Sequence, residues 1–98
     1  MRCIDQEGGR VSRLKQRDGF PDPVSARQMA RTSEPVAARF AYRNMARALA
    51  ELGFDCNLAP VVDVDVNPGR PAVGAAERSY SRDPAIVVQF AEAFVDAH

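Results

Sequence analysis

The sequence predicts an α/β fold in which strands alternate with helices. A short apolar run ends in acidic residues near position 5, and a β-branched run follows at residues 58–66. Residues 33–52 and 84–98 instead repeat apolar side chains at helical spacing. This alternation is typical of a parallel sheet with right-handed crossovers. We therefore expect about two consecutive βα units in the 98 residues, a slice of a larger α/β protein, because an eight-stranded βα barrel needs roughly 250 residues.

The first unit begins with a strand over residues 3–6 that stops at the glycine pair in GGR. These glycines predict a tight turn with positive φ. They match neither the phosphate-loop pattern nor the dinucleotide-binding pattern, so a nucleotide site is not expected. A Gly- and Pro-rich loop over residues 16–23 and a short helix over residues 24–31 follow.

The clearest element is a helix over residues 33–52. Ser33 is the expected N-cap, Pro35 fits the first turn, and Gly53 fits the position just after the helix. Its predicted apolar face consists of Ala38, Ala41, Met45, Ala48, Leu49 and Leu52.

The second unit has a buried strand over residues 58–66, although Pro60 fits a central strand poorly. The loop over residues 67–82 is long enough to suspect a functional role. Asp83 then caps a helix over residues 84–98. The predicted apolar face of this helix is Val87, Phe90, Ala91, Phe94 and Val95.

Composition excludes several classes of function. The net charge is zero, so neither nucleic acid nor an anionic membrane is an expected partner. No stretch approaches the roughly 20 apolar residues of a membrane span, and the start lacks the apolar core of a signal peptide. A cytoplasmic location is therefore the expectation. Cys3, Cys56 and His98 are too few and too far apart for a zinc site, so no metal is expected and the cysteines should be reduced and buried.

The stretch DVDVN resembles the start of a calcium loop only superficially. Asp63, Asp65 and Asn67 fit the opening, but Pro68 occupies the required glycine position and Gly74 the required glutamate position. Alternation along a strand explains the two aspartates more simply.

Carboxylates and arginines gather near both predicted strand ends. The carboxylates are Asp5, Glu7, Asp63 and Asp65, and the arginines are Arg10, Arg13 and Arg78. In parallel α/β proteins the loops at these ends meet at one face, where ligands bind. Carboxylates accept hydrogen bonds from sugar hydroxyls and arginines donate to oxygens, so a carbohydrate site is chemically reasonable. Composition alone leaves both readings open but favours solvated surface charge at strand ends and helix starts.

Three motifs in order narrow the choice: IDQEGGRVSRL, GFDCNLAPVVDVDVNP and ERSYSRDP. They resemble the bacterial β-N-acetylhexosaminidases of glycoside hydrolase family 3 over nearly the whole chain. The resemblance implies that residues 1–98 are a fragment of an N-terminal barrel domain, a partial (β/α)8 TIM-type barrel of about two consecutive βα units. It also implies retaining hydrolysis of terminal β-linked N-acetylglucosamine in peptidoglycan or chitin-like fragments, without a cofactor.

The resemblance assigns substrate binding to Asp5, Arg13 and Arg78. Asp5 would accept hydrogen bonds from sugar hydroxyls, and the two arginines would donate to sugar oxygens. The segment before Arg78 is longer than is usual in the family. Glu7, Arg10, Asp63 and Asp65 receive no role.

The resemblance places no catalytic residue in this chain. The family's lysine–histidine pair, its acid/base histidine–aspartate dyad and its nucleophilic aspartate have no counterpart here, and His98 has no motif around it. We expect a segment of a β-N-acetylhexosaminidase that is inactive alone. The alternatives are a truncated remnant, at most a weak carbohydrate-binding piece, or an unrelated α/β binding module.

Overall fold

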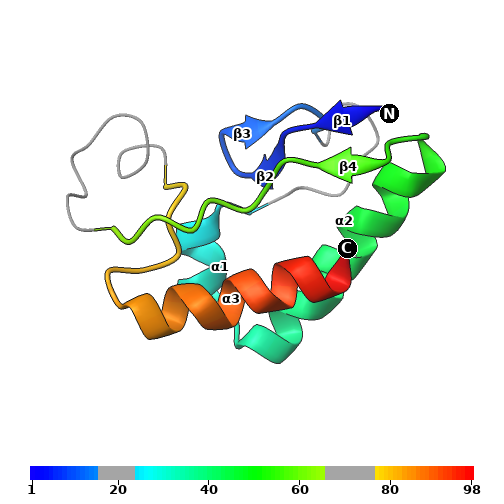
Figure 1. Cartoon of the computed structure of the whole chain (residues 1–98). Helices are drawn as coiled ribbons and strands as arrows, with labels where there is room; N and C mark the ends of the chain where they lie inside the picture. The colour runs from blue at the N-terminus through cyan, green and yellow to red at the C-terminus, as the bar shows by residue number, and fades with distance from the viewer. Residues whose placement is uncertain (16–23, 66–76) are drawn as a thin grey trace.

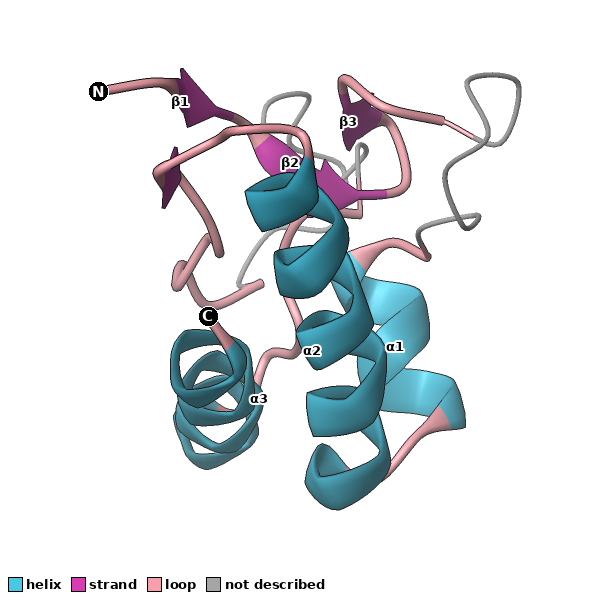
Figure 2. Ribbon diagram, turned by 90° about the vertical axis from the view of Figure 1, so that its right-hand side faces the viewer, coloured by secondary structure: helices cyan, strands magenta, loops and turns pink. Residues whose placement is uncertain are grey.

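The computed structural model describes residues 1–15, 24–65 and 77–98. Short strands form one layer and helices form the other, as Figures 1 and 2 show from two sides. The elements in chain order are β1 (Cys3–Ile4), β2 (Gln6–Gly8), β3 (Val11–Ser12), α1 (Ala26–Thr32), α2 (Pro35–Glu51), β4 (Cys56–Asn57) and α3 (Pro84–Ala97). The mixed α/β class predicted from the sequence is confirmed.

Strands β1 and β4 form the parallel pair that the alternating pattern predicts. Cys3 lies opposite Cys56, and Ile4 lies opposite Asn57. The backbone N–H of Leu58 donates to the carbonyl of Ile4 over 2.7 Å, which extends the ladder one step. The two strands, whose register partners are 53 residues apart in sequence, thus lie side by side in Figure 1.

The second strand differs from the prediction of residues 58–66. Only Cys56–Asn57 is a strand, residues 58–65 are irregular, and residue 66 lies outside the described residues. Two physical reasons explain the difference. Pro60 has no N–H for a ladder, and β1 ends at Ile4, so the chain beyond Leu58 has no partner strand there.

An antiparallel hairpin, β2–β3, follows β1 and was not predicted. Gln6, which is fully buried, joins its two sides. Its Oε1 accepts from the backbone N–H groups of Arg13 and Leu14 over 2.9 and 3.1 Å, and its Nε2 donates to the Leu14 carbonyl over 2.8 Å. The glycine turn is confirmed, with φ of 112° at Gly8 and 59° at Gly9.

The helix boundaries lie within two residues of most predictions. In α1, Ser25 Oγ accepts from the Gln28 N–H over 3.2 Å, and the helix runs from Ala26 to Thr32 rather than over residues 24–31. In α2 the N-cap is Glu34 rather than Ser33, while Gly53 has the positive φ of 87° expected after the helix.

Helix α3 begins as predicted. Asp83 Oδ1 accepts from the Ala85 N–H over 2.9 Å, and Pro84 occupies the first helical position.

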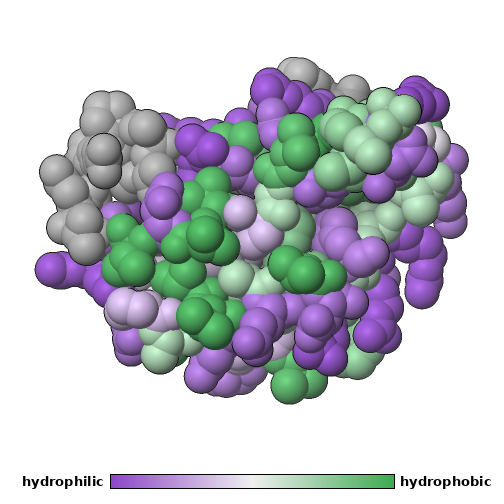
Figure 3. All heavy atoms as spheres, in the orientation of Figure 1, coloured by the Kyte–Doolittle hydropathy of each residue, from purple (hydrophilic) through white to green (hydrophobic). Residues whose placement is uncertain are grey.

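The core lies between the helices and the strands. Its α2 residues are Ala38, Tyr42, Met45 and Leu49, and its α3 residues are Val87, Phe90, Ala93 and Phe94. The predicted faces were partly wrong, because Ala41, Leu52 and Val95 are exposed. In α2, Tyr42 rather than its neighbour Ala41 faces the core. Apolar side chains on the face drawn in Figure 3 gather over α3 and the chain after β4. Exposed apolar residues in these segments include Leu58, Val62, Val88 and Val95.

Two tyrosine hydroxyls meet inside the core. Tyr42 is 1% exposed, Tyr80 is 3% exposed, and their hydroxyl oxygens are 2.8 Å apart, so one donates to the other. Burial raises the pKa of Tyr42 to about 12, and the bond from Tyr80 opposes this shift slightly. Burial, with the neighbouring Tyr42 and Glu7, also raises the pKa of Tyr80.

This pair predicts a stability loss at alkaline pH. A raised folded-state pKa means that folding favours the neutral phenol, so the contribution is complete below the unfolded pKa of about 10. It is lost as pH rises from about 10 through 12. Circular dichroism should therefore show unfolding together with tyrosinate absorbance at 295 nm, which reports both tyrosines of the chain. The double variant Tyr42→Phe/Tyr80→Phe should lack this dependence, and an equal pH profile for the two proteins would contradict the assignment.

Candidate functional site

Five charged side chains form the candidate site, which we call the carboxylate–arginine cluster. Its members are Asp5, Glu7, Arg13, Asp63 and Arg78. Asp5 directly follows β1, Glu7 lies in β2, and Arg13 follows β3. The hydrogen bond that Arg78 donates to Glu7 is the largest cause that raises the pKa of Arg78, and the charges of Glu7, Asp5 and Asp63 add to it. Segments far apart in sequence therefore bring their charges together here.

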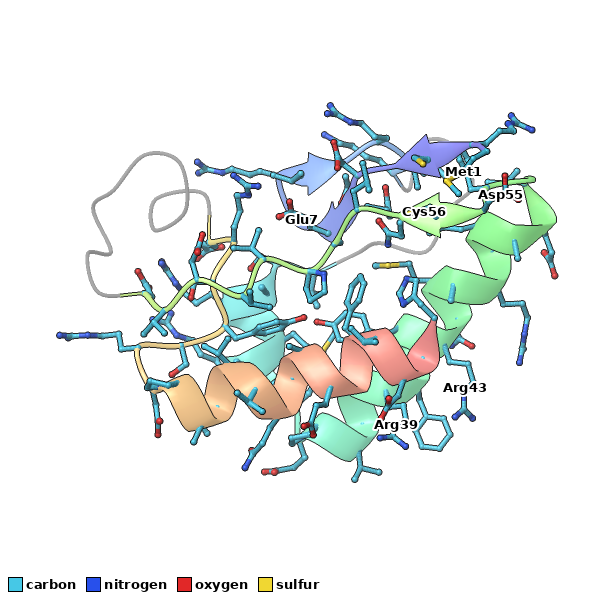
Figure 4. All side chains as sticks on the ribbon, in the orientation of Figure 1. Met1, Glu7, Arg39, Arg43, Asp55 and Cys56 are labelled. Atoms are coloured by element: carbon cyan, nitrogen blue, oxygen red, sulfur yellow. The ribbon has the colours of Figure 1, made fainter. Side chains whose placement is uncertain are left out.

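The strongest contact in the cluster joins Glu7 to Arg78. Arg78 Nε donates to Glu7 Oε2 over 3.0 Å, and Nη2 donates to Oε1 over 2.9 Å. The side chain of Glu7 is 8% exposed and that of Arg78 is 30% exposed. Two parallel charge-assisted bonds fix the plane of the guanidinium. In Figure 4 Glu7 lies at the lower edge of the strand layer.

Asp5 and Arg13 form a looser pair in the same cluster. Asp5 Oδ2 and Arg13 Nη2 are 3.6 Å apart, and the side chains are 42% and 67% exposed. The backbone N–H of Arg13 is held by the buried Gln6 amide. The hairpin therefore fixes the backbone position of Arg13, while the Arg13 side chain stays accessible to a ligand.

The two aspartates of DVDVN have different environments. Asp65 pairs with Arg27 over 2.7 Å, and both side chains are largely buried. Asp63 is exposed, and its carbonyl accepts from the buried Ser79 hydroxyl over 2.6 Å. This bond ties the segment that carries Arg78 to the segment after β4. Asp65 thus has a structural ion pair, whereas Asp63 belongs to the cluster.

The structure therefore brings the three residues expected to bind substrate into one cluster. Asp5 and Arg13 are direct neighbours, and Arg78 lies within electrostatic reach of Asp5. Sequence reasoning missed Glu7 as the partner of Arg78. The only available signal was its place in the same motif as Asp5, because 71 residues separate it from Arg78.

His98 and the two cysteines do not belong to the carboxylate–arginine cluster. His98 stacks on Phe94 with ring centroids 4.2 Å apart, and its Nε2 is 3.1 Å from Asn57 Nδ2. Burial lowers the pKa of His98, an effect that its hydrogen bond to the Phe94 carbonyl opposes. The expected burial of both cysteines was wrong. Cys3 is exposed and Cys56 is partly exposed, because Ile4 takes the position of β1 that faces the core.

The described residues contain neither a metal-binding cluster nor a membrane-spanning helix. Across residues 1–15, 24–65 and 77–98, no group of three or more His, Cys, Asp or Glu side chains is arranged to hold a metal ion. Within the same ranges, no helix has the length and apolar character needed to cross a membrane.

Comparisons with known proteins agree on one family. Curated relatives include the β-hexosaminidase LpqI of Mycobacterium tuberculosis, 41% identical over 91 residues that are 93% of this chain and 23% of the relative. A β-hexosaminidase of Xanthomonas oryzae pv. oryzae is 41% identical over 101 residues, covering 97% of this chain and 28% of the relative. The chain thus spans about a quarter of the length of these relatives.

Solved structures give the same result. The β-N-acetylhexosaminidase of Beutenbergia cavernae matches with a TM-score of 0.89 at 31% identity, over 97% of this chain and 29% of that one. LpqI of M. tuberculosis matches with a TM-score of 0.82 at 37% identity, over 97% and 27% of the two chains. The family model for the glycosyl hydrolase family 3 N-terminal domain, which has a TIM-barrel-type fold, matches residues 1–98. The chain therefore belongs to glycosyl hydrolase family 3.

Proposed function

We propose that this chain is a segment of a family 3 β-N-acetylhexosaminidase and contributes part of its sugar-binding site. The proposal includes residues 1–98 as about two βα units of the N-terminal barrel domain. Relatives named β-hexosaminidase support it, and they are about four times longer than the matched segment. The observation that carries the proposal is the cluster itself, in which Asp5, Arg13 and Arg78 gather beyond β1.

The cluster fits the chemistry of a terminal N-acetylglucosamine residue. Asp5 accepts hydrogen bonds from ring hydroxyls, while Arg13 and Arg78 donate to hydroxyl or acetamido oxygens. Exposure of Asp5 and Arg13 leaves both side chains accessible to such a ligand. Because each charge-assisted bond contributes about 1.5 to 3 kcal/mol, a few of them are enough to orient one sugar ring.

Glu7 has a positioning role in this proposal. It is almost buried and holds two donor atoms of Arg78, so the guanidinium plane is set before the sugar arrives. A preorganised arginine loses less side-chain entropy on binding than a mobile one. Glu7 itself is directed at Arg78 rather than at the ligand.

Retaining hydrolysis requires a nucleophile and an acid/base group on opposite sides of the glycosidic bond, about 5 to 5.5 Å apart. The family motifs that supply these groups do not occur in this sequence. We therefore propose that the chain binds the sugar without hydrolysing it, and that hydrolysis belongs to a longer protein. The preferred glycan, from peptidoglycan or chitin-like material, and the cytoplasmic location stay predictions.

An assay with an aryl β-N-acetylglucosaminide tests the division between binding and catalysis. The purified chain should release no chromophore above the level of buffer. N-acetylglucosamine should shift the amide NMR signals of residues near Asp5, and galactose should shift them less. Turnover that Asp5→Ala abolishes would contradict the proposed inactivity. If N-acetylglucosamine causes no shifts, the chain is instead a remnant that does not bind the sugar.

A further inference from the structure

Cys3 and Cys56 are register partners on the parallel strands β1 and β4. Both cysteines are free, Cys3 is exposed, and Cys56 is partly exposed. Figure 4 labels Cys56 on β4 beside Asp55, close to the start of the chain. They are the two cysteines of the sequence, and the candidate sugar site uses neither.

The strand pairing brings these two thiols close together. Neighbouring strands lie about 4.8 Å apart, and register partners in a parallel pair leave the same face of the sheet. Disulfides join Cα atoms that are about 4.4 to 6.8 Å apart, so the spacing of the strands lies within the permitted range. Partial desolvation raises the pKa of Cys3, as do a side-chain hydrogen bond with Cys56 and the charges of Cys56 and Asp55. The register pairing therefore places the two side chains next to each other on one face of the sheet.

We propose that Cys3 and Cys56 form an oxidisable dithiol, which a small disulfide such as oxidised glutathione converts into an intrachain disulfide between β1 and β4. One cysteine thiolate attacks the glutathione disulfide and expels a glutathione thiolate. The second cysteine thiolate then attacks the protein sulfur of the mixed disulfide and expels the other glutathione. In total, two protein thiols lose two protons and two electrons, and one oxidised glutathione becomes two reduced molecules.

The bond would join the two ends of a long segment of the fold. The segment from Cys3 to Cys56 contains the β2–β3 hairpin and helices α1 and α2. Closing a loop of this length restricts the unfolded chain, so the oxidised form should be the more stable one. The proposal rests on strand pairing alone and stands independently of sugar binding.

Incubation of the full 98-residue chain with oxidised glutathione tests the proposal by intact-protein mass spectrometry. The expected product is a monomer lighter by about 2 Da, since two hydrogens leave. The equilibrium between this product and the mixed disulfide should favour the internal bond at least about 10-fold more in buffer than in concentrated guanidinium chloride. Cys3→Ser and Cys56→Ser should each stop at the mixed disulfide.

Several results would overturn the proposal. These are glutathione retained on both cysteines, disulfide-linked dimers as the main product, or the same equilibrium in buffer and in denaturant. Thermal unfolding gives a second readout, in which oxidation should raise Tm by about 5 °C or more. A bond that forms and lowers Tm would show that it is incompatible with the native strand pair.

Discussion

Arg78→Ala is expected to weaken binding of N-acetylglucosamine to this chain by about 10-fold to 150-fold. The range corresponds to loss of one charge-assisted hydrogen bond of about 1.5 to 3 kcal/mol. An NMR titration that follows the amide signals near Asp5 measures the effect and shows at the same time whether the variant is folded. Arg39→Ala is the matched control, since Arg39 forms an exposed ion pair with Asp96 on the helices, with 3.1 Å between the charged atoms. Its affinity should equal that of the parent chain.

Glu7→Gln separates the positioning role from direct contact. Glutamine has nearly the shape of glutamate but cannot offer two charged oxygens to Nε and Nη2 of Arg78. We expect affinity to fall by about 10-fold with Arg78 still present, because the guanidinium is then less firmly held. Arg78→Lys should bind the sugar as weakly as Arg78→Ala, whether or not Glu7 is also replaced, since lysine lacks the planar fork. Unchanged affinity in both Arg78→Ala and Glu7→Gln would exclude this cluster as the sugar site.

Local signals explain which elements the sequence predicted correctly. Asp83 before a proline predicts the start of α3, Gly53 predicts the end of α2, and the glycine pair predicts the turn at residues 8 and 9. Each signal acts through backbone groups only a few residues away. The alternation of strands and helices likewise predicted a parallel pairing, although the second strand, β4, lies at Cys56–Asn57 rather than within residues 58–66.

The predictions that failed depend on contacts between distant residues. The hairpin forms because Gln6 turns inward and bonds to the backbone of residues 13 and 14, and no periodic pattern shows this. The second strand is short because its partner ends at Ile4, which is 53 residues away from its register partner Asn57. In the site, the motif resemblance pointed to Arg78, but the pairing with Glu7 spans 71 residues and requires the folded chain.

Phe94→Ala is expected to have the largest effect on stability, a loss of about 3 to 5 kcal/mol. The ring of Phe94 is 1% exposed and lies between Tyr42 and His98, with centroid distances of 4.6 and 4.2 Å. Removing it leaves a cavity between α2 and α3 and exposes the buried tyrosine pair to water. A domain of about 100 residues has a total stability of roughly 5 to 15 kcal/mol, so this loss removes a large share.

Urea unfolding followed by circular dichroism measures this loss, and Val95→Ala provides the control. Val95 is the next residue of the same helix but is 63% exposed, so its truncation should change stability by less than about 0.5 kcal/mol. Both substitutions introduce the same helix-favouring residue, and the difference between them therefore isolates burial from helix propensity. Because α3 packs on α2, and the end of α2 leads directly into β4, loss of this contact should also loosen the β1–β4 pair. Equal midpoints for the two variants would mean that the helix pair is not the core on which the strands depend.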